Sequence, residues 1–272
     1  MLIDTHCHLD AREFDADRDA VIVAARAAGV SGIVIPSIAT NNFAAVRDCC
    51  TRYPGCFPAY GLHPLYIERT DEADFSMLRD WLRKESIGAC PPVALGEIGL
   101  DYFVPGFDAA RQEHFFIEQL KIARDFDLPV LLHVRRSLDH VLKYLRRISV
   151  RGGIAHAFNG SRQQADEFIR LGFRLGFGGA MTYPGSTRIR KLASTLPINA
   201  IVLETDAPDM APCWLAGERN TPLELIRIAR TFSELRGLSL AAVMAATTAN
   251  VLEILNLPLP DPMHPDSPGM AV

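Results

Sequence analysis

The sequence lacks the features typical of a membrane-spanning or secreted protein. The apolar stretch over residues 21–38 is interrupted by Arg26, Gly29 and Pro36, so it falls short of the roughly 20 apolar residues that cross a bilayer. The first residues contain neither a basic region nor an apolar segment of the secretory type, so we expect no signal peptide. We therefore expect no association with a membrane.

An excess of positive charge is also lacking. The chain has 28 basic and 32 acidic residues, and its formal net charge is −4. This balance argues against a broad basic platform for nucleic acid. It leaves room for a small basic cleft, or for a metal site that supplies positive charge locally.

The cysteines do not follow a disulfide or zinc-binding pattern. There are 6 of them, none in a C-x-x-C motif, and Cys49 is adjacent to Cys50, which is poor geometry for two ordinary bridges. This usage favours free thiols in a reducing compartment, so we expect a cytoplasmic protein.

Length and composition indicate an ordinary globular chain. Its 272 residues suggest one or two domains by length alone, but an α/β barrel of roughly 250 residues forms one domain. Hydrophobic residues make up 49% and charged residues 22%, which excludes the disordered and fibrous classes.

The hydrophobic pattern alternates between short apolar runs and helical segments. Strands are expected at residues 2–6, 32–36, 56–60, 93–97, 129–133, 153–156, 173–177 and 201–205. Helices are expected over residues 17–28, 40–52, 72–85, 108–125, 137–148, 161–171, 187–194, 223–236 and 240–255. The strands are continuously apolar, which indicates a parallel sheet that is buried on both faces.

Eight such units predict a single-domain α/β protein, a (β/α)₈ TIM barrel over residues 1–257. A doubly wound sheet is the structural alternative, and it is less favoured because no G-x-G-x-x-G motif follows a strand. Residues 258–272 are rich in proline, so we expect an extended or disordered tail there.

Polar residues with metal-ligating side chains recur where the expected strands end. They are His6, His8, His63, Glu97, His133, His156 and Asp206. In a barrel the carboxyl ends of all strands open on one face, so these side chains should converge there. His6 and His8 share one side of an extended chain, with Cys7 on the other, and imidazoles combined with carboxylates predict a divalent metal site.

Three further carboxylates lie near these positions. Asp4 and Asp10 flank the two N-terminal histidines, where a carboxylate can orient a ligand imidazole. For Asp10 a role as a loop or capping residue is equally consistent with the sequence. Glu204 is interpreted as a supporting residue and not as a ligand.

Five short motifs resemble those of the TatD family of metal-dependent deoxyribonucleases. They appear in the family's order as Thr5-His6-Cys7-His8-Leu9-Asp10, Gly96-Glu97-Ile98-Gly99-Leu100-Asp101-Tyr102, Leu132-His133, His156-Ala157-Phe158-Asn159-Gly160 and Glu204-Thr205-Asp206-Ala207-Pro208. The second and fifth strings are specific, whereas H-x-H occurs across the amidohydrolase superfamily. The resemblance covers residues 1–257 and implies a (β/α)₈ barrel that hydrolyses phosphodiesters with divalent metal ions, often as a 3′–5′ exonuclease on single-stranded DNA.

The resemblance also implies a division of the site residues between two cations. His6, His8 and Asp206 would hold one cation, and Glu97 would bridge it to a second. The second cation would also be held by His133 and His156, and His63 would face the substrate phosphate. The spacing of the residues by itself predicts the group of ligands but not their assignment to two ions.

Two cations would polarise a phosphoryl oxygen and lower the pKa of a water, with Asp206 accepting the proton. The ligand types fit Mg²⁺, Mn²⁺ or Zn²⁺ alike. Arg135 and Arg136, just after His133, are candidates for contacts with the backbone phosphates of DNA.

Two other functions fit the same motifs less well. One is an amidohydrolase that acts on a small amide, lactone or amino-heterocycle. Many such barrels bridge two metals with a carboxylated lysine after strand four, but here Glu97 occupies that position and none of the four lysines lies at an expected strand end. The other is a barrel with a purely structural metal, for which an open group of mixed ligands is a poor match.

Overall fold

Within residues 1–215 and 217–257, which the computed structural model describes, eight parallel β-strands lie side by side in sequence order. They are β1 Leu2–Asp4, β2 Val30–Pro36, β3 Cys56–Tyr60, β4 Ala94–Asp101, β5 Val130–Arg135, β6 Gly153–Ala155, β7 Phe173–Phe177 and β8 Ile201–Leu203. The ring closes between β8 and β1, because the Thr5 N–H donates to the carbonyl of Leu203 and Cys7 pairs with Ala207 in a parallel bridge. The predicted TIM barrel is confirmed.

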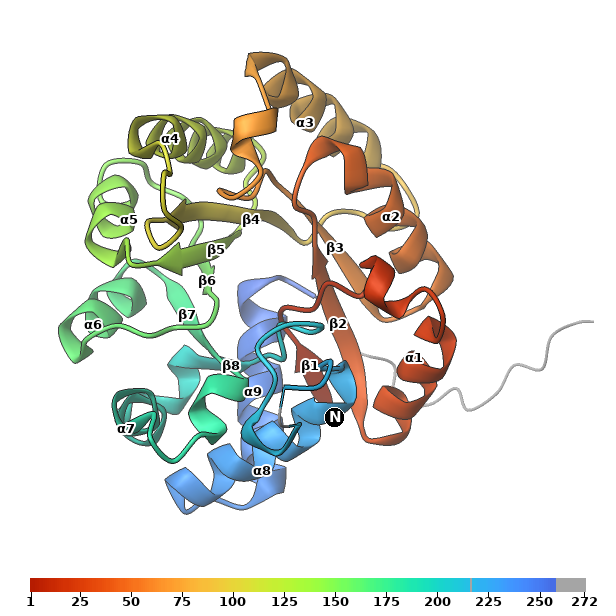
Figure 1. Ribbon diagram of the computed structural model, residues 1–272, viewed down its shortest axis with the longest axis vertical. Helices are drawn as coiled ribbons and strands as arrows, with labels where there is room; N and C mark the ends of the chain where they lie inside the picture. The colour runs from red at the N-terminus through yellow and green to blue at the C-terminus, as the bar shows by residue number, and fades with distance from the viewer. Residues whose placement is uncertain (216, 258–272) are drawn as a thin grey trace, which may run out of the picture.

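Helices surround the strands (Figure 1). The α-helices are α1 Arg18–Ala27, α2 Phe43–Arg52, α3 Glu72–Glu85, α4 Ala109–Asp125, α5 Leu138–Leu145, α6 Arg162–Arg170, α7 Thr187–Thr195, α8 Leu225–Arg236 and α9 Leu240–Ile254. Short 3₁₀ helices cover Arg12–Phe14, Thr40–Asn42, Ile67–Arg69, Gly179–Thr182, Ile198–Ala200, Cys213–Leu215 and Pro222–Glu224. Most strands are followed by one main helix, and β8 is followed by α8 and α9.

The interior of the barrel is a packed core and not a pore. Seven strands contribute buried apolar side chains to one cluster: Ile3, Val34, Ala59, Ala94, Leu131, Ile154 and Val202. Val251 and Ile254 of α9, followed by Leu255 and Leu257, pack against this cluster. The end of α9 therefore closes the amino-terminal end of the barrel, which leaves the opposite end for polar side chains.

Several elements have the bounds that the sequence predicts, including β3, β7 and α3. Other predicted bounds are wrong. The fourth and fifth strands are predicted to end at Glu97 and His133, but β4 continues to Asp101 and β5 to Arg135. The predicted helix over 40–52 begins with a 3₁₀ turn, because Oδ1 of Asn42 accepts the Ile38 and Ala39 N–H groups and holds the chain in a tight turn.

No single helix in residues 1–215 and 217–257 is long and apolar enough to cross a membrane. The pair Pro222–Arg236 and Leu240–Ile254 meets the length and composition requirement only jointly, across a bend of 108°. The predicted proline-rich tail, residues 258–272, lies outside the described residues.

Candidate metal centre

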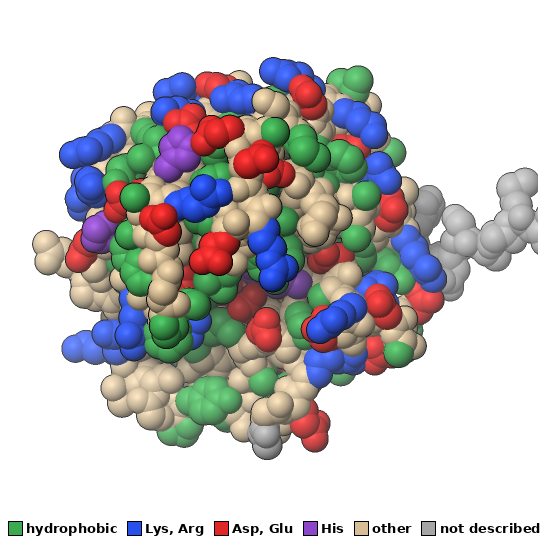
Figure 2. All heavy atoms as spheres, turned by 45° about the horizontal axis from the view of Figure 1, so that its top comes forward, with side chains coloured by type: hydrophobic (Ala, Val, Ile, Leu, Met, Phe, Trp, Pro, Cys, Tyr) green, Lys and Arg blue, Asp and Glu red, His purple; other side chains and the backbone are tan. Residues whose placement is uncertain are grey.

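The predicted ligands lie together at the carboxyl ends of the strands. One face of the molecule is hollowed, and histidine shows within the hollow among basic and acidic side chains (Figure 2). His6 and Glu97 are buried, whereas the side chains of His8, His133 and Asp206 keep 18%, 14% and 14% of their surface exposed. The group is therefore deep but open to small molecules from one side.

Two glycines allow β4 to approach β5 closely enough to bring Glu97 to His133. A Cβ on Gly96 would lie 2.6 Å from Cβ of Leu131. Gly99 has a φ of +152°, and a Cβ there would lie 1.9 Å from the carbonyl oxygen of His133. Neither position accepts a larger side chain, so the G-E-I-G spacing is a packing requirement of this strand pair.

The carboxylate of Glu97 stands at the centre of the group, with its two oxygens directed at different imidazoles. Oε2 lies 3.0 Å from Nε2 of His6 and 3.6 Å from Nε2 of His8. Oε1 lies 2.7 Å from Nδ1 of His133 and 3.0 Å from Nε2 of His156. One carboxylate thus directs its two oxygens at different imidazoles, although His6 and His156 also lie close together and form a candidate metal group with Asp206.

Asp206 joins the set on the Oε2 side. Its Oδ1 lies 3.7 Å from Nε2 of His6 and 3.9 Å from Nε2 of His8. The residue follows β8 in a left-handed conformation with φ of 56°, and its N–H donates to the carbonyl of His6. The link between β8 and β1 therefore fixes Asp206 beside the two N-terminal histidines.

Asp101 is a site residue that the sequence analysis missed. Its Oδ2 lies 3.0 Å from Nε2 of His133, the ring nitrogen that faces away from Glu97. Asp101 is fully buried, and its Oδ1 accepts the N–H of Phe103 at 2.9 Å. A carboxylate in this position favours the neutral tautomer of His133 with its proton on Nε2, in which the lone pair of Nδ1, on the side of Glu97, is the one that could bind a metal. The sequence signal that could have identified Asp101 was its position four residues after Glu97 in the same motif.

Of the two carboxylates near the N-terminal histidines, Asp4 does not orient an imidazole, whereas Asp10 makes the loop contact that was one of its two predicted roles. Asp4 contacts no imidazole ring; its side chain accepts the N–H of Thr205 at 2.9 Å and the Thr205 hydroxyl at 2.5 Å. Asp10 accepts the side-chain amide of Asn42 at 2.9 Å, which is a loop contact. Asp4 therefore positions the segment that carries Asp206, because Thr205 directly precedes it.

Glu204 supports the neighbouring strand end. Its Oε1 accepts the N–H of Ala157 at 2.5 Å and lies 3.8 Å from Nδ1 of His156. Burial raises the pKa of Glu204 to about 7, and burial likewise raises the pKa of Asp4 to about 7. Glu204 and Asp4 both lie behind the predicted metal ligands and support the strand ends that carry them.

His63 lies at the edge of the group as a hydrogen-bond donor. Its Nδ1 accepts the N–H of Leu65 at 3.1 Å, so the proton of the neutral ring is on Nε2. Burial lowers the pKa of His63 to about 4, so the ring is neutral at pH 7. Nε2 lies 3.4 Å from Oε1 of Glu97 and 3.1 Å from Nδ1 of His133. In this tautomer Nε2 carries an N–H that an anion can accept. His63 also belongs, with Glu97 and His133, to one of the groups of side chains close enough together to hold a cation.

The protonation of the histidines follows from burial and from the central carboxylate. Burial lowers the pKa of His6 to about 3, assisted by the charge of His156. Burial also lowers the pKa values of His8 and His156, but the nearby carboxylate of Glu97 has the larger effect and raises them to about 9 and about 10. Burial acts upward on Glu97, yet the surrounding imidazoles hold its pKa well below its usual range.

The chemistry of these residues fits divalent cations. Buried carboxylates are ordinarily paired with a cation. Among the described residues, no Lys or Arg side chain forms an ion pair with Glu97 or Asp206; the partners of both are imidazoles. Imidazole nitrogens combined with carboxylate oxygens are the ligands that Zn²⁺, Mn²⁺ and related ions accept. The four lysines all lie in helices, so Glu97 and not a lysine separates the two sets.

Arg135, the last residue of β5, and Arg136 are exposed at the rim. Both guanidinium groups lie over the ring of Phe103, with Cζ at 3.7 Å and 4.5 Å from its centroid. Arg135 is also 3.9 Å from Oδ2 of Asp101. These contacts link the rim to the residue that orients His133.

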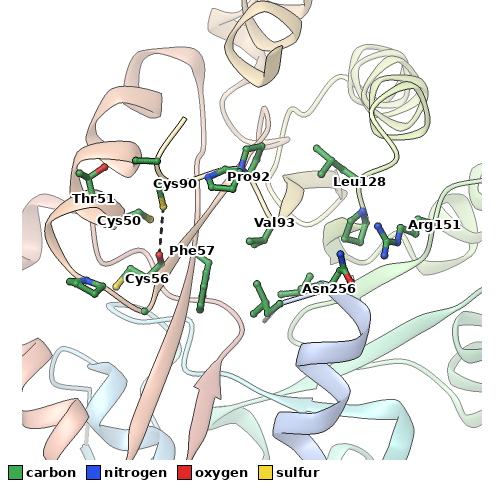
Figure 3. Close-up of a pocket in the computed structure, with 17 residues that line it drawn as sticks. Cys50, Thr51, Cys56, Phe57, Cys90, Pro92, Val93, Leu128, Arg151 and Asn256 are labelled. Atoms are coloured by element: carbon green, nitrogen blue, oxygen red, sulfur yellow. Dashed lines mark hydrogen bonds between the residues drawn. The ribbon is translucent and has the colours of Figure 1, made fainter. Parts of the chain in front are cut away.

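A cavity of about 590 Å³ lies elsewhere (Figure 3). Cys50, Cys56, Cys90, Phe57 and Leu128 are among the residues that line it. It is bordered by the first residue of β3 and by the residues just before β4 and β5, so it lies at the amino-terminal end of the barrel. None of the predicted ligands lines this cavity.

Comparisons with known proteins agree with the motifs. Residues 3–256 match the model of the family described as TatD related DNase. The metal-dependent hydrolase YjjV of Escherichia coli K12, described as uncharacterized, is 37% identical, over 94% of this chain and 98% of that protein. The 3′-5′ ssDNA/RNA exonuclease TatD of Cronobacter sakazakii is 32% identical, over 93% of this chain and 97% of that protein.

The fold agrees as well. The crystal structure of YjjV, a TatD homologue, superposes with a TM-score of 0.90 and covers 94% of this chain and 98% of that one. The family predicted from the five motifs is thereby confirmed. The chain belongs to the TatD family of metal-dependent hydrolases.

Proposed function

We propose that the protein is a phosphodiesterase that uses two divalent cations and removes nucleotides from the 3′ end of single-stranded DNA. The observation that carries the proposal is the central carboxylate of Glu97, whose two oxygens are directed at two separate sets of donor atoms. The similarity to a relative that is named a 3′-5′ exonuclease supports the choice of substrate. The open side of the group gives a strand end access to it.

The ligands divide according to the oxygen of Glu97 that they face. His6, His8 and Asp206 would hold one cation together with Oε2. His133 and His156 would hold the other together with Oε1. When bound, divalent cations supply Lewis-acid polarisation of the phosphoryl group and lower the pKa of a water, and they stabilise the departing 3′ oxygen. Mg²⁺, Mn²⁺ and Zn²⁺ all suit this ligand set.

Asp206 is the proposed proton acceptor. Its Oδ1 faces His6 and His8, which leaves Oδ2 for the proton of the attacking water. Burial raises the pKa of this carboxyl above its ordinary value, which makes it a better base than an exposed aspartate. Its left-handed backbone keeps it at the end of β8, facing the open side.

His63 and the two arginines are proposed to hold the substrate. The Nε2–H of His63 points into the group beside Oε1 of Glu97, where a phosphate oxygen can accept it. Arg135 and Arg136 are exposed at the rim and would contact the next backbone phosphates. The small number of these contacts suits the net charge of −4, because bound cations supply the remaining positive charge.

The test is a time course with a single-stranded oligodeoxynucleotide labelled at its 5′ end. We expect a metal-dependent ladder that shortens one nucleotide at a time from the 3′ end, and loss of the ladder when the 3′ end is blocked. An RNA oligonucleotide and a small amide run in parallel separate the proposed substrate from the alternatives. Cleavage of the amide alone would overturn the proposal.

The arginines are tested by the salt dependence of binding. Replacing both by glutamine should weaken binding of the oligonucleotide, and the slope of log affinity against log salt should fall by roughly one per lost phosphate contact. An unchanged slope would place the nucleic-acid contacts elsewhere on the rim.

A further inference from the structure

Phe103 is an exposed aromatic ring beside the metal centre. It lies in the loop after β4, and 41% of its surface is exposed. Among the described residues, three Phe, Tyr or Trp side chains are exposed, Tyr66, Phe103 and Tyr183, and each follows a strand at the carboxyl end of the barrel. Within the described part of the chain, the exposed Phe and Tyr rings thus lie on the face that carries the ligands.

The backbone of Phe103 is tied to that centre by hydrogen bonds. Oδ1 of Asp101 accepts the N–H of Phe103, while Oδ2 of the same carboxylate faces Nε2 of His133. Asp101 pairs with Arg135 in the register of β4 and β5, and the Tyr102 N–H donates to the carbonyl of Arg135 at 2.8 Å. One buried carboxylate therefore connects the loop that carries Phe103 to an imidazole that contacts Glu97.

The neighbours of the ring leave part of it exposed. Tyr102 stacks on Phe107 with centroids 4.7 Å apart, so the loop folds back on itself without covering Phe103. Both Arg135 and Arg136 have their guanidinium groups over the ring. Arg136 adopts a left-handed backbone with φ of 56°, which is uncommon for a residue with a side chain.

An aromatic ring next to two guanidinium groups suits a nucleotide. A base has a π-face that stacks on an aromatic side chain whatever its sequence, and the guanidinium groups pair with the flanking phosphates. An incoming base would take the place of a guanidinium over the ring, and the released arginine would bind phosphate. The loop after β4 and the end of β5 thus offer a contact for the base and a contact for the phosphate of one nucleotide.

We propose that Phe103 is a stacking platform for one base of a single-stranded nucleic acid, next to the metal centre. The inference rests on the proposed function and adds to it the position of a base. It makes binding dependent on the presence of a base but tolerant of which base it is. Tyr66 and Tyr183 mark the same face and are not needed for the proposal.

The experiment measures binding of fluorescent octanucleotides by anisotropy with Mn²⁺ present, in an Asp206→Asn background, which should suppress cleavage and largely keep metal affinity. Phe103→Ala should weaken binding about 5- to 150-fold, the range that alanine substitution of a stacking residue gives. Phe103→Tyr should restore most of it, because it keeps the ring. Val104→Ala, an equally simple change at the next exposed residue, is the matched control, and thermal unfolding checks that all variants are folded.

An abasic nucleotide, placed at each position in turn, identifies the stacked base. At one position it should weaken binding to the parent protein by the same factor as Phe103→Ala, with no further loss in the Phe103→Ala variant. If the losses of affinity from the abasic nucleotide and from Phe103→Ala multiply at every position, the two act independently and the platform is overturned. Unchanged binding by Phe103→Ala would overturn it as well. In that case, shortening of DNA by the wild-type protein would still support the proposed function. A wild-type protein that neither binds nor cleaves any oligonucleotide would overturn both.

Discussion

Replacing Asp101 by asparagine should switch the proton of His133 from one ring nitrogen to the other. In the wild type Oδ2 of Asp101 accepts from Nε2 of His133 at 3.0 Å, and Nδ1 faces Glu97 at 2.7 Å. Burial acts upward on the pKa of Asp101, but the hydrogen bonds from His133 and Phe103 hold it below its ordinary value, so it is ionised at pH 7. Asparagine can keep its oxygen on the Phe103 N–H, and then its amide donor faces Nε2.

Two donors cannot share a hydrogen bond, so His133 should move its proton to Nδ1. A protonated Nδ1 cannot ligate a metal. We expect metal affinity and the rate of hydrolysis to fall about 10- to 100-fold, the usual cost of losing a residue that orients a ligand. Stability should fall by only about 1 kcal/mol, because a charged hydrogen bond becomes a neutral one of similar geometry.

The assay combines metal titration by calorimetry with ¹⁵N spectra of the histidine rings, which distinguish the two tautomers. Asp80→Asn on the exposed surface of α3 is the control for the loss of one negative charge. Wild-type metal affinity in Asp101→Asn together with an Nδ1–H tautomer would refute the reasoning, because His133 would then not ligate through Nδ1.

Four further outcomes are expected. Glu97→Ala should reduce metal-dependent hydrolysis more than about 10³-fold, because several kcal/mol of charge stabilisation are lost with both cations, and circular dichroism should show an intact fold. Near-normal turnover at saturating metal would remove Glu97 from the mechanism. Asp206→Asn should lower turnover by about 10²- to 10⁴-fold but metal affinity much less; a calorimetric affinity that collapses in step with activity would make it only a ligand. His63→Ala should raise KM for an oligonucleotide with metal content by mass spectrometry unchanged, whereas unchanged cleavage would confine the residue to packing. Finally, the pKa values of His8 and His156 are raised to about 9 and about 10 without metal, so metal binding must displace their protons, and metal affinity should rise with pH between 6 and 9. Calorimetry at pH 7 in buffers of different ionisation enthalpy should show proton release on metal binding. Its absence would contradict these protonation states.

The fold was largely predictable because each strand is a continuous apolar run bounded by turns. The bound of the fourth strand failed because of two glycines. Gly96 and Gly99 resemble strand breakers in a sequence, but here they allow two strand backbones to approach each other, so β4 continues to Asp101. Such a use of glycine depends on the neighbouring strand, which the local sequence does not specify.

The convergence of the histidines and carboxylates was predictable from the strand ends, whereas their contacts were not. The role of Asp101 depends on its position opposite Arg135 in the register of β4 and β5, which places it beside His133. Asp4 lies beside His6 in the sequence but binds Thr205, because the ring closes between β1 and β8. Contacts between strands that are distant in the sequence thus decide which carboxylate supports which ligand.

The most direct test of the account is a crystal structure of the protein with Mn²⁺, analysed by anomalous scattering. We predict two peaks, one on each side of the Glu97 carboxylate, with His6, His8 and Asp206 around the first and His133 and His156 around the second. His63 should contact neither. A single peak, or peaks that Glu97 does not touch, would contradict the account.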